Sequence, residues 1–366
     1  MTPGGGGAAD RAESAAPAAS AAPPSRAARA LAALGIGLLV ALWSHHHLVV
    51  SRSLGEDFTW PWRAARALLS GLDPYAVIRP VGPFPFDAYF KYPLPAALVA
   101  IPFASLPAEA AGALFIGLSV ALLAWALTRE SWERLPILLS GCVASAVKSA
   151  QWSPLLAAAL LLSPWAVGLG VLKPNLGVPM FLARPSWRAV AAGAGLLALS
   201  LVVQPTWPVE WLRVLRTGLE AHYMSPAAGG PGLLALGPLL LLGLLRWRRP
   251  EARLLVALAC VPQVPTFYDQ LFLLLIPRTF RESATTALLS AVAYMYLFSR
   301  PSLTHERTAT WILLTVYGPA LLLVLRRPNE GEVPAWLDRA AGSVAWRVRA
   351  LVGRAARRGR RERAPS

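Results

Sequence analysis

The stretch at residues 109–127, EAAGALFIGLSVALLAWAL, has one acidic residue at its start and no charged residue after it. An α-helix needs about 20 mostly apolar residues to cross the hydrocarbon core of a bilayer. This stretch is long enough to cross, and similar apolar runs recur along the chain. They lie near residues 29–50, 93–105, 109–127, 135–147, 152–163, 166–183, 187–204, 231–245, 252–264, 270–277, 284–298 and 309–325.

The composition supports a membrane protein. The 366 residues are 55% hydrophobic and only 15% charged, whereas soluble domains are charged at about 25% of positions. The sequence therefore predicts an all-α integral membrane protein, a polytopic bundle. We expect about 9–12 transmembrane helices and a juxtamembrane helix in an outer-face loop.

Three regions follow from the same pattern. Residues 1–28 are rich in Gly, Ala, Pro and Ser and predict a disordered cytoplasmic arm. Residues 29–325 form the predicted transmembrane domain. Residues 326–366 form a basic cytoplasmic tail, which anionic lipid attracts.

The basic residues predict the orientation in a cytoplasmic membrane. With a cytoplasmic N-terminus and a crossing at every run, most Lys and Arg lie inside, as the positive-inside rule requires. This assignment puts Lys148 and Arg184 inside, and Arg129 and Arg134 outside. The main polar segments then share the outer side, where we expect a pocket. These segments are 51–92, 205–230 and 262–269.

The first outer loop contains the stretch LGEDFTWPWRAARALLSGLDPYAVIRP at residues 54–80. Thr59 or Trp60 can cap a short helix, with Pro61 in its first turn and Gly71 at its end. Asp57 would then lie just before the helix, where the helix dipole favours a carboxylate. A plain interfacial connector, in which the acid only caps the helix, explains the loop as well.

Three later segments place polar residues within or beside apolar runs. Tyr268 and Asp269 lie at the outer mouth of a run, as a cavity pair or as a helix cap with an interfacial tyrosine. Lys173 lies within a run and needs an anionic partner, either a phosphate headgroup or a carboxylate such as Asp57 or Asp269. Gln151, at a break between runs, either contacts a ligand or satisfies backbone groups, and we favour the second.

The sequence contains no motif that predicts metal binding or nucleotide binding. The adjacent His45, His46 and His47 point in different directions on a helix and suit a metal poorly. The chain has no Asp-x-Asp motif and no Gly-rich phosphate loop. We therefore expect no metal and no cofactor, and we expect no nucleic-acid partner because no RNA-binding module is visible.

Five segments, taken in this order, resemble glycosyltransferase family 87 over about residues 30–325. They are EDFTWPWRAARALLSGLDPYAV (56–77), FKYPLPAALVAIPFASLP (90–107), SAQWSPLLAAALLL (149–162), LKPNLGVPMFLARPSWRAV (172–190) and PTFYDQLFLLLIP (265–277). The family contains membrane mannosyltransferases and related arabinofuranosyltransferases that use polyprenyl-phosphate sugars. The chain departs from it in being short and in having Ala150-Gln151 where Gly-Gln is common.

The resemblance implies a GT-C bundle with its active site on the outer face, beneath the first loop. The donor would be a polyprenyl-phosphate sugar and the acceptor a glycolipid or glycan. Asp57 matches the acidic residue that acts as general base.

A single base without a covalent nucleophile predicts inversion at the anomeric carbon. Cations would stabilise the leaving phosphate. The predicted substrate-binding residues are Arg63, Arg66, Lys91, Tyr92, Lys173, Asn175, Tyr268 and Asp269. A transporter or flippase of a lipid-linked sugar is the main alternative, and a silent membrane scaffold is another.

Overall fold

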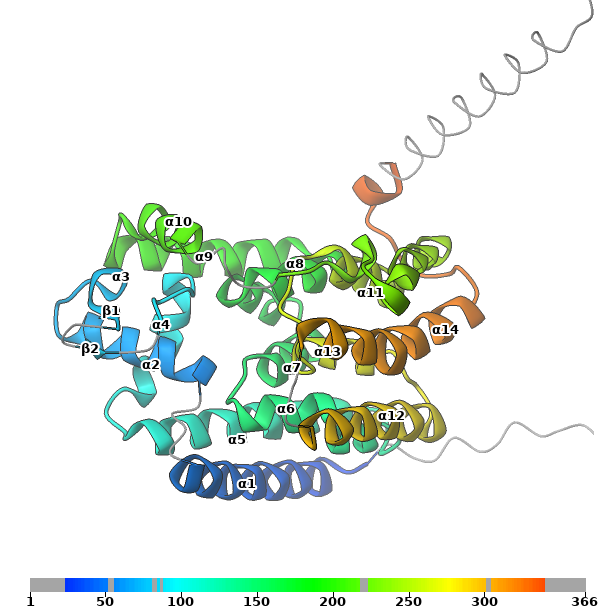
Figure 1. The fold of residues 1–366 in the computed structure, drawn as a ribbon, viewed down its shortest axis with the longest axis horizontal. Coiled ribbons are helices and arrows are strands. Elements are labelled where there is room, and N and C mark those ends of the chain that lie inside the picture. The colour runs from blue at the N-terminus through cyan, green and yellow to red at the C-terminus, as the bar shows by residue number, and fades with distance from the viewer. Residues whose placement is uncertain are drawn as a thin grey trace, which may run out of the picture.

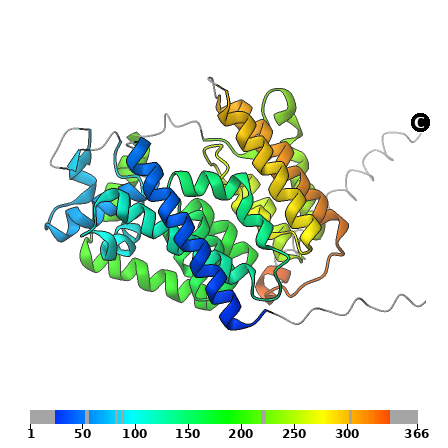
Figure 2. The same cartoon turned by 90° about the horizontal axis from the view of Figure 1, so that it is seen from below.

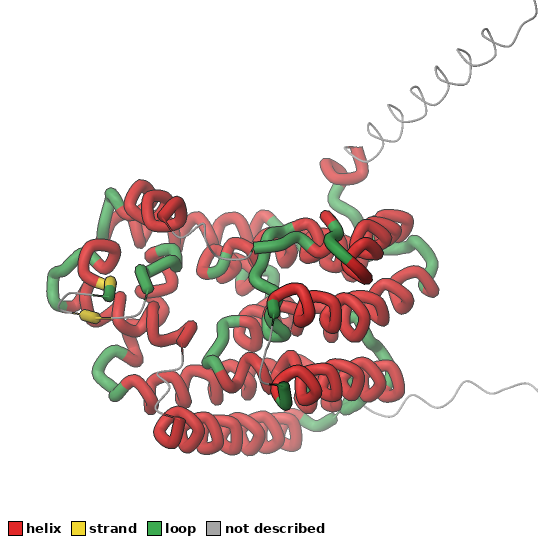
Figure 3. Tube along the Cα trace, in the orientation of Figure 1, coloured by secondary structure: helices red, strands yellow, loops and turns green. Residues whose placement is uncertain are grey.

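The computed structural model describes residues 24–51, 56–80, 84–85, 88–217, 223–300 and 304–339. These residues form an all-α structure of long and short helices packed in a bundle (Figures 1 and 3). The predicted all-α class is confirmed. Among the described residues, the strands are the parallel pair β1 (Ile78–Arg79) and β2 (Phe84–Pro85), with Ile78 opposite Phe84. An isolated antiparallel bridge joins Met224 to Gln263.

Helix α1 (Arg26–Ser51) lies on the surface of the bundle and packs along α5 (Ala108–Leu127) (Figure 2). The two backbones touch at Gly37 and Gly117. A Cβ atom added to Gly37 would lie 2.8 Å from the Gly117 carbonyl oxygen and 2.7 Å from the Ala121 Cβ. Small residues at this spacing allow the close helix approach that is typical of membrane helices.

Three helical stretches are long and apolar enough to cross a membrane: Arg26–Ser51, Ala108–Leu127 and His305–Arg326. The last comprises α13 (His305–Ile312), the π-helical η7 (Leu313–Tyr317) and α14 (Gly318–Arg326). A fourth span results if α9 (Trp187–Val203) and the helix after it, bent by 97°, are taken together. Large apolar side chains such as Leu34 and Leu38 of α1 are exposed, as expected for lipid contact. These features fit a membrane protein, and the predicted number of crossings stays a prediction.

One end of the bundle carries a layer of short elements. It comprises α2 (Glu56–Leu69), α3 (Pro74–Val77), the two strands, α4 (Leu94–Ala100) and η1 (Ile101–Phe103), flanked by α10 (Trp207–Thr217). Helix α2 packs its alanines against α4 and α5, and Ala64 and Ala65 are fully buried. We call this the Asp57 end, after the acid at the start of α2.

The remaining helices complete the bundle. They are η2 (Leu135–Leu139), α6 (Gly141–Lys148), α7 (Ser153–Leu162), η3 (Ala166–Leu172), α8 (Pro174–Ala183), η4 (Pro226–Ala228), η5 (Gly232–Arg246), α11 (Pro250–Cys260), η6 (Asp269–Leu275) and α12 (Phe280–Phe298). Helices η3 and α8 form a tight hairpin, because a Cβ atom on Gly170 would lie 2.6 Å from the Gly177 Cα. Lys173 lies at the tip of this hairpin.

The structure corrects the predicted sides of three basic residues. Arg129 and Arg134, predicted outside, line one cavity with Arg184, which was predicted inside. Lys148, predicted inside, precedes Ser149, whose carbonyl oxygen accepts a 3.4 Å hydrogen bond from the Asp57 N–H group. Lys148 therefore lies at the Asp57 end.

The cause of this error is the predicted run 93–105. Helix α4 has seven residues, which rise only about 10 Å at 1.5 Å per residue, far less than the ~30 Å of a bilayer core. Helices α4 and η1 instead pack beside α2. The predicted run 93–105 is therefore too short in the structure to separate residues 51–92 from those that follow it.

The predicted terminal regions are only partly described. Helix α1 begins at Arg26 rather than at residue 29, and residues 1–23 of the predicted arm lie outside the described part of the chain. Residues 340–366 of the predicted tail also lie outside it. The described start of the tail packs on the turn between η5 and α11, where the Arg248 N–H donates to Asn329 Oδ1 at 3.0 Å.

Candidate functional site

The first candidate residue, Asp57, lies in the first turn of α2. The predicted cap at Thr59 or Trp60 is wrong, because the helix already begins at Glu56 and includes Pro61 in its interior. Proline has no N–H group, so Pro61 cannot donate to the carbonyl of Asp57 four residues earlier. The predicted end of the helix is confirmed, since Gly71 has the left-handed φ of 71° that suits glycine.

Tyr92 holds the Asp57 carboxylate. Its hydroxyl donates a 2.8 Å hydrogen bond to Asp57 Oδ1. Its own backbone carbonyl accepts a 2.9 Å hydrogen bond from the Tyr75 hydroxyl. Burial, and then the Asp57 charge, raise the pKa of Tyr92, which lies in the loop before α4. The phenol therefore stays protonated at neutral pH and acts as the donor.

A second cluster forms around Lys173 and Asp269. Lys173 Nζ lies 2.8 Å from Asp269 Oδ1 and 3.3 Å from Gln151 Oε1. Asn175 Nδ2 donates to Asp269 Oδ2 at 3.2 Å. The ammonium group also lies 4.8 Å from the centre of the Tyr268 ring. Asp269, only 3% exposed, is thus held by a cation and an amide donor, as a buried carboxylate requires.

The two clusters are neighbours. The Tyr92 ring lies 6.4 Å from the ring of Trp152, and the adjacent Gln151 contacts Lys173. In keeping with this, the charges of Tyr268 and Asp269 add to that of Asp57 in raising the pKa of Tyr92. The structure therefore gathers six of the predicted site residues from four separate segments of the chain. They are Asp57, Tyr92, Lys173, Asn175, Tyr268 and Asp269.

The other three predicted residues are arranged differently. Arg66 is exposed on α2, with its guanidinium 4.9 Å from the centre of the Trp62 ring. Lys91 is half-buried, and its backbone carbonyl accepts a 2.9 Å hydrogen bond from Trp211 Nε1. Arg63 is half-buried on α2. No contact described for Arg66 or Lys91 joins them to Lys173 within the described residues.

The break after α6 positions Gln151 beneath Lys173. The Gln151 N–H donates to the Ala146 carbonyl at 2.9 Å, and the Ala150 N–H donates to the Val147 carbonyl at 3.4 Å. This is a Schellman ending, in which the residue at the position of Ala150 is usually glycine. Ala150 adopts a φ of 46°. The side chain of Gln151 consequently bonds Lys173, rather than the backbone groups that we favoured from the sequence.

Three buried polar atoms around the start of α7 were missed by the sequence analysis. Gln151 Nε2, Trp152 Nε1 and Ser153 Oγ are buried and have no hydrogen-bond partner among the described residues. They lie at the start of α7, where backbone N–H groups also lack helical acceptors. Such a set suits an anionic or oxygen-rich ligand. The sequence carries no signal for these atoms, because their lack of a partner depends on how the surrounding helices pack. Of the three residues, Gln151 contacts Lys173, and the Trp152 ring lies 6.4 Å from the Tyr92 ring.

An apolar groove of about 490 Å³ begins beside the polar site. It runs between α8, α9 and α10, and its walls include Pro93, Pro174, Val178, Phe181 and Trp211. Pro93 follows Tyr92 and Pro174 follows Lys173 in the chain. The groove therefore leads away from both clusters, and its apolar walls suit a hydrocarbon chain.

No family model, no curated protein and no solved structure matches this chain. The argument for function consequently rests on the site. Within the described ranges, no three His, Cys, Asp or Glu side chains come together as metal ligands. The site consists of two carboxylates, one ammonium group, buried neutral donors and an adjoining apolar groove.

Proposed function

We propose that this protein is a membrane glycosyltransferase. It moves a sugar, mannose or a similar one, from a polyprenyl-phosphate donor to a glycolipid or glycan acceptor at the outer face of the cytoplasmic membrane. The observation that carries the proposal is the Asp57–Tyr92 pair beside Lys173 and its neighbouring buried donors. The resemblance to glycosyltransferase family 87 supports the same function.

In the proposed reaction, the acceptor oxygen attacks the anomeric carbon while Asp57 takes the hydroxyl proton. The new carbon–oxygen bond forms as the bond to the donor phosphate breaks, and polyprenyl phosphate leaves. The configuration at the anomeric carbon inverts because no enzyme nucleophile takes part. Tyr92 orients the carboxylate of Asp57 through its 2.8 Å hydrogen bond.

The leaving phosphate gains charge in the transition state, and fixed donors in a buried site stabilise that charge well. Lys173 supplies the cation, and Gln151, which contacts it, supplies the unpartnered donor Nε2. Asp269 keeps Lys173 in place before the donor binds. Tyr268 and Asn175 border the space in which we place the sugar.

The adjoining groove gives the prenyl chain a place. Burying hydrocarbon against its apolar walls is favourable by about 25 cal/mol per Å² of apolar surface removed from water. The chain would leave the site sideways between α8 and α9.

A transporter or flippase of a lipid-linked sugar is the second candidate. The observation in its favour is that the helical path breaks at Lys173, between η3 and α8, and that the short helix η6 begins at Asp269. Transporters use such discontinuous helices to coordinate their substrates.

The deciding experiment measures transfer by the purified full chain in lipid. It uses radiolabelled polyprenyl-phosphate mannose and arabinose, with a panel of glycolipid acceptors. Asp57→Asn is compared with Asp73→Asn, a matched change at the same end, where Asp73 caps α3 and accepts a hydrogen bond from Gln204. Transfer lost only in Asp57→Asn supports the proposal. Sugar-lipid flux across sealed vesicles without transfer by the wild type refutes it in favour of the transporter.

A further inference from the structure

A cavity of about 1180 Å³ lies at the opposite end of the bundle from Asp57. Six arginines from four separate stretches line it, and we call it the arginine pocket. They are Arg129, Arg134, Arg184, Arg249, Arg253 and Arg278. Part of the wall is apolar, with Leu160, Leu254 and Ile276 among its residues.

Several of these arginines are fixed by the carbonyl ends of helices. Arg184 donates to the Leu160 carbonyl at the end of α7 at 2.9 Å. Arg253 donates to the Leu182 carbonyl near the end of α8 at 2.7 Å. Helix C-termini carry unsatisfied carbonyl groups and a partial negative charge, so arginine caps them well. These contacts hold the guanidinium groups in place but add no full negative charge.

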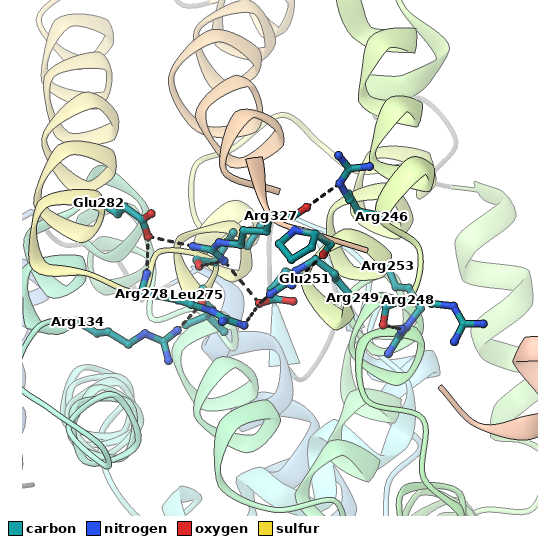
Figure 4. Close-up of polar contacts among 12 residues, drawn as sticks. Arg134, Arg246, Arg248, Arg249, Glu251, Arg253, Leu275, Arg278, Glu282 and Arg327 are labelled. Carbon is teal, nitrogen blue, oxygen red and sulfur yellow. Dashed lines mark hydrogen bonds and ion pairs between the residues drawn. The ribbon is translucent and has the colours of Figure 1, made fainter. Parts of the chain in front are cut away.

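The described carboxylates do not balance the arginines. One oxygen of Glu251 serves three guanidinium groups, at 2.7 Å from Arg278, 3.4 Å from Arg249 and 3.6 Å from Arg327 (Figure 4). The other acids on the wall are exposed to solvent: Glu130, Glu330 and Glu332. Burial lowers the pKa of Arg134, and the nearby charges of Arg278 and Arg327 lower it further against the opposing effect of Glu130 and Glu251.

Two of the guanidinium groups have an Nε–H donor without a hydrogen-bond partner among the described residues. Arg249 is only 7% exposed, and its Nε has no hydrogen-bond partner among the described residues. The same holds for the buried Nε of Arg134. Both residues line the cavity, and buried donors of charged groups are normally satisfied. A ligand oxygen that accepts a hydrogen bond from each Nε–H group would explain why neither group has a partner in the protein.

We propose that the arginine pocket binds a phosphate-bearing anion. Arginine forks match phosphate oxygens, and several fixed forks around one cavity bind a phosphate or a phosphodiester more strongly than a single surface arginine does. The ligand is either the headgroup of an anionic lipid, whose chains would contact the apolar wall, or a free phosphate compound. This site is separate from the Asp57 cluster and does not depend on the proposed glycosyl transfer.

The test measures ligand binding by the full chain in detergent. One arm follows thermal unfolding in pyrophosphate against chloride at matched ionic strength. The other counts bound phosphatidylglycerol against phosphatidylcholine by native mass spectrometry. Stabilisation by pyrophosphate identifies a free phosphate compound as a ligand, whereas retention of phosphatidylglycerol alone identifies the lipid headgroup.

Arg129→Glu is the informative variant. Arg129 is exposed on the pocket wall, and no hydrogen bond or ion pair within the described residues involves its guanidinium. We expect affinity to fall roughly tenfold, because one charge-assisted contact becomes repulsive. Glu332→Gln, which removes an acid from the same wall, should strengthen binding.

Arg188→Glu is the matched control, since Arg188 is exposed at the start of α9 and does not line the cavity. It should change affinity less than about twofold, because exposed charges are screened. Equal weakening by Arg129→Glu and Arg188→Glu would overturn the proposal, and so would a wild-type protein that binds neither probe.

Discussion

The Tyr92 hydroxyl donates a 2.8 Å hydrogen bond to Asp57, joining the start of α2 to the loop that precedes α4. The two residues are 35 positions apart. Because Tyr92 is itself held through its backbone carbonyl by Tyr75, the hydroxyl has little freedom to move. The carboxylate that we propose as the base is therefore oriented by a side chain whose own position is fixed.

Replacing Tyr92 with Phe should lower kcat/KM for sugar transfer about five- to tenfold. The change removes one oriented hydrogen bond, a loss of about 1–1.5 kcal/mol, and leaves the ring and the Tyr75 contact in place. Tyr89→Phe is the control, because Tyr89 is exposed in the same loop. Full activity in Tyr92→Phe would show that Asp57 needs no such orientation.

Replacing Lys173 with Met should lower the free energy of unfolding by about 3–5 kcal/mol, since Asp269 is then left charged and buried. The double change Lys173→Met with Asp269→Leu should recover much of this loss but restore no transfer. Thermal unfolding and the transfer assay measure the two effects separately.

Asp338→Asn provides the comparison for that ion pair. Asp338 and Arg248 are also 2.8 Å apart, but their side chains are 49% and 41% exposed. Losing an exposed pair changes stability by less than about 1 kcal/mol. Normal sugar transfer by the Lys173→Met, Asp269→Leu double variant would mean that the Lys173–Asp269 pair has only a structural role.

Replacing Ala150 with Gly should raise the thermal unfolding temperature without loss of activity. The φ of 46° disfavours alanine by about 1–2 kcal/mol, and the greater entropy of unfolded glycine offsets part of the gain, leaving about 0.5 kcal/mol or more. Ala144→Gly, at an exposed position within α6, should instead destabilise by about 0.5–1 kcal/mol. Destabilisation by both changes would contradict this account of the turn.

Apolar runs and isolated polar residues were enough to predict the helical class and most of the residues that meet at the site. Asp269 was one of the partners that the sequence offered for Lys173, and the structure selects it. The partner could not be chosen from the sequence, because a buried cation requires an anionic partner but its own sequence neighbours do not show which carboxylate lies close to it. The end of α2 was predictable because Gly71 marks it locally.

Other features depend on contacts that no local pattern contains. The sides of Arg129 and Arg134 were mispredicted because an apolar run of suitable composition, 93–105, packs beside α2. The unpartnered donors of Trp152 and Ser153 depend on how α7 packs in the bundle. The arginine pocket is lined by segments as far apart in the chain as Arg129 and Glu332. Taken singly, each arginine is an ordinary residue near a helix end and does not predict the pocket.

Replacing Gly37 with Ile should destabilise the protein by about 2 kcal/mol or more, because α1 cannot approach α5 with a side chain at this point. Gly35→Ile is the matched control on the same helix, since a Cβ atom there meets nothing within 4 Å. Thermal unfolding in detergent measures the difference. Equal effects from the two changes would mean that helix propensity, and not the close contact with Gly117, decides the result.

Replacing Ala194 with Trp should raise KM roughly tenfold for a long-chain polyprenyl-phosphate donor. Ala194 lies on the wall of the apolar groove, so the indole would take the space that we assign to the prenyl chain, while the clusters around Asp57 and Lys173 stay intact. A donor truncated to a short chain should be used equally well by the variant and the wild type. Leu199→Trp, on the exposed face of α9 away from the groove, controls for a bulky aromatic residue on this helix. An equal loss with long and short donors would place the prenyl chain elsewhere, because a blocked groove penalises only the chain that must enter it.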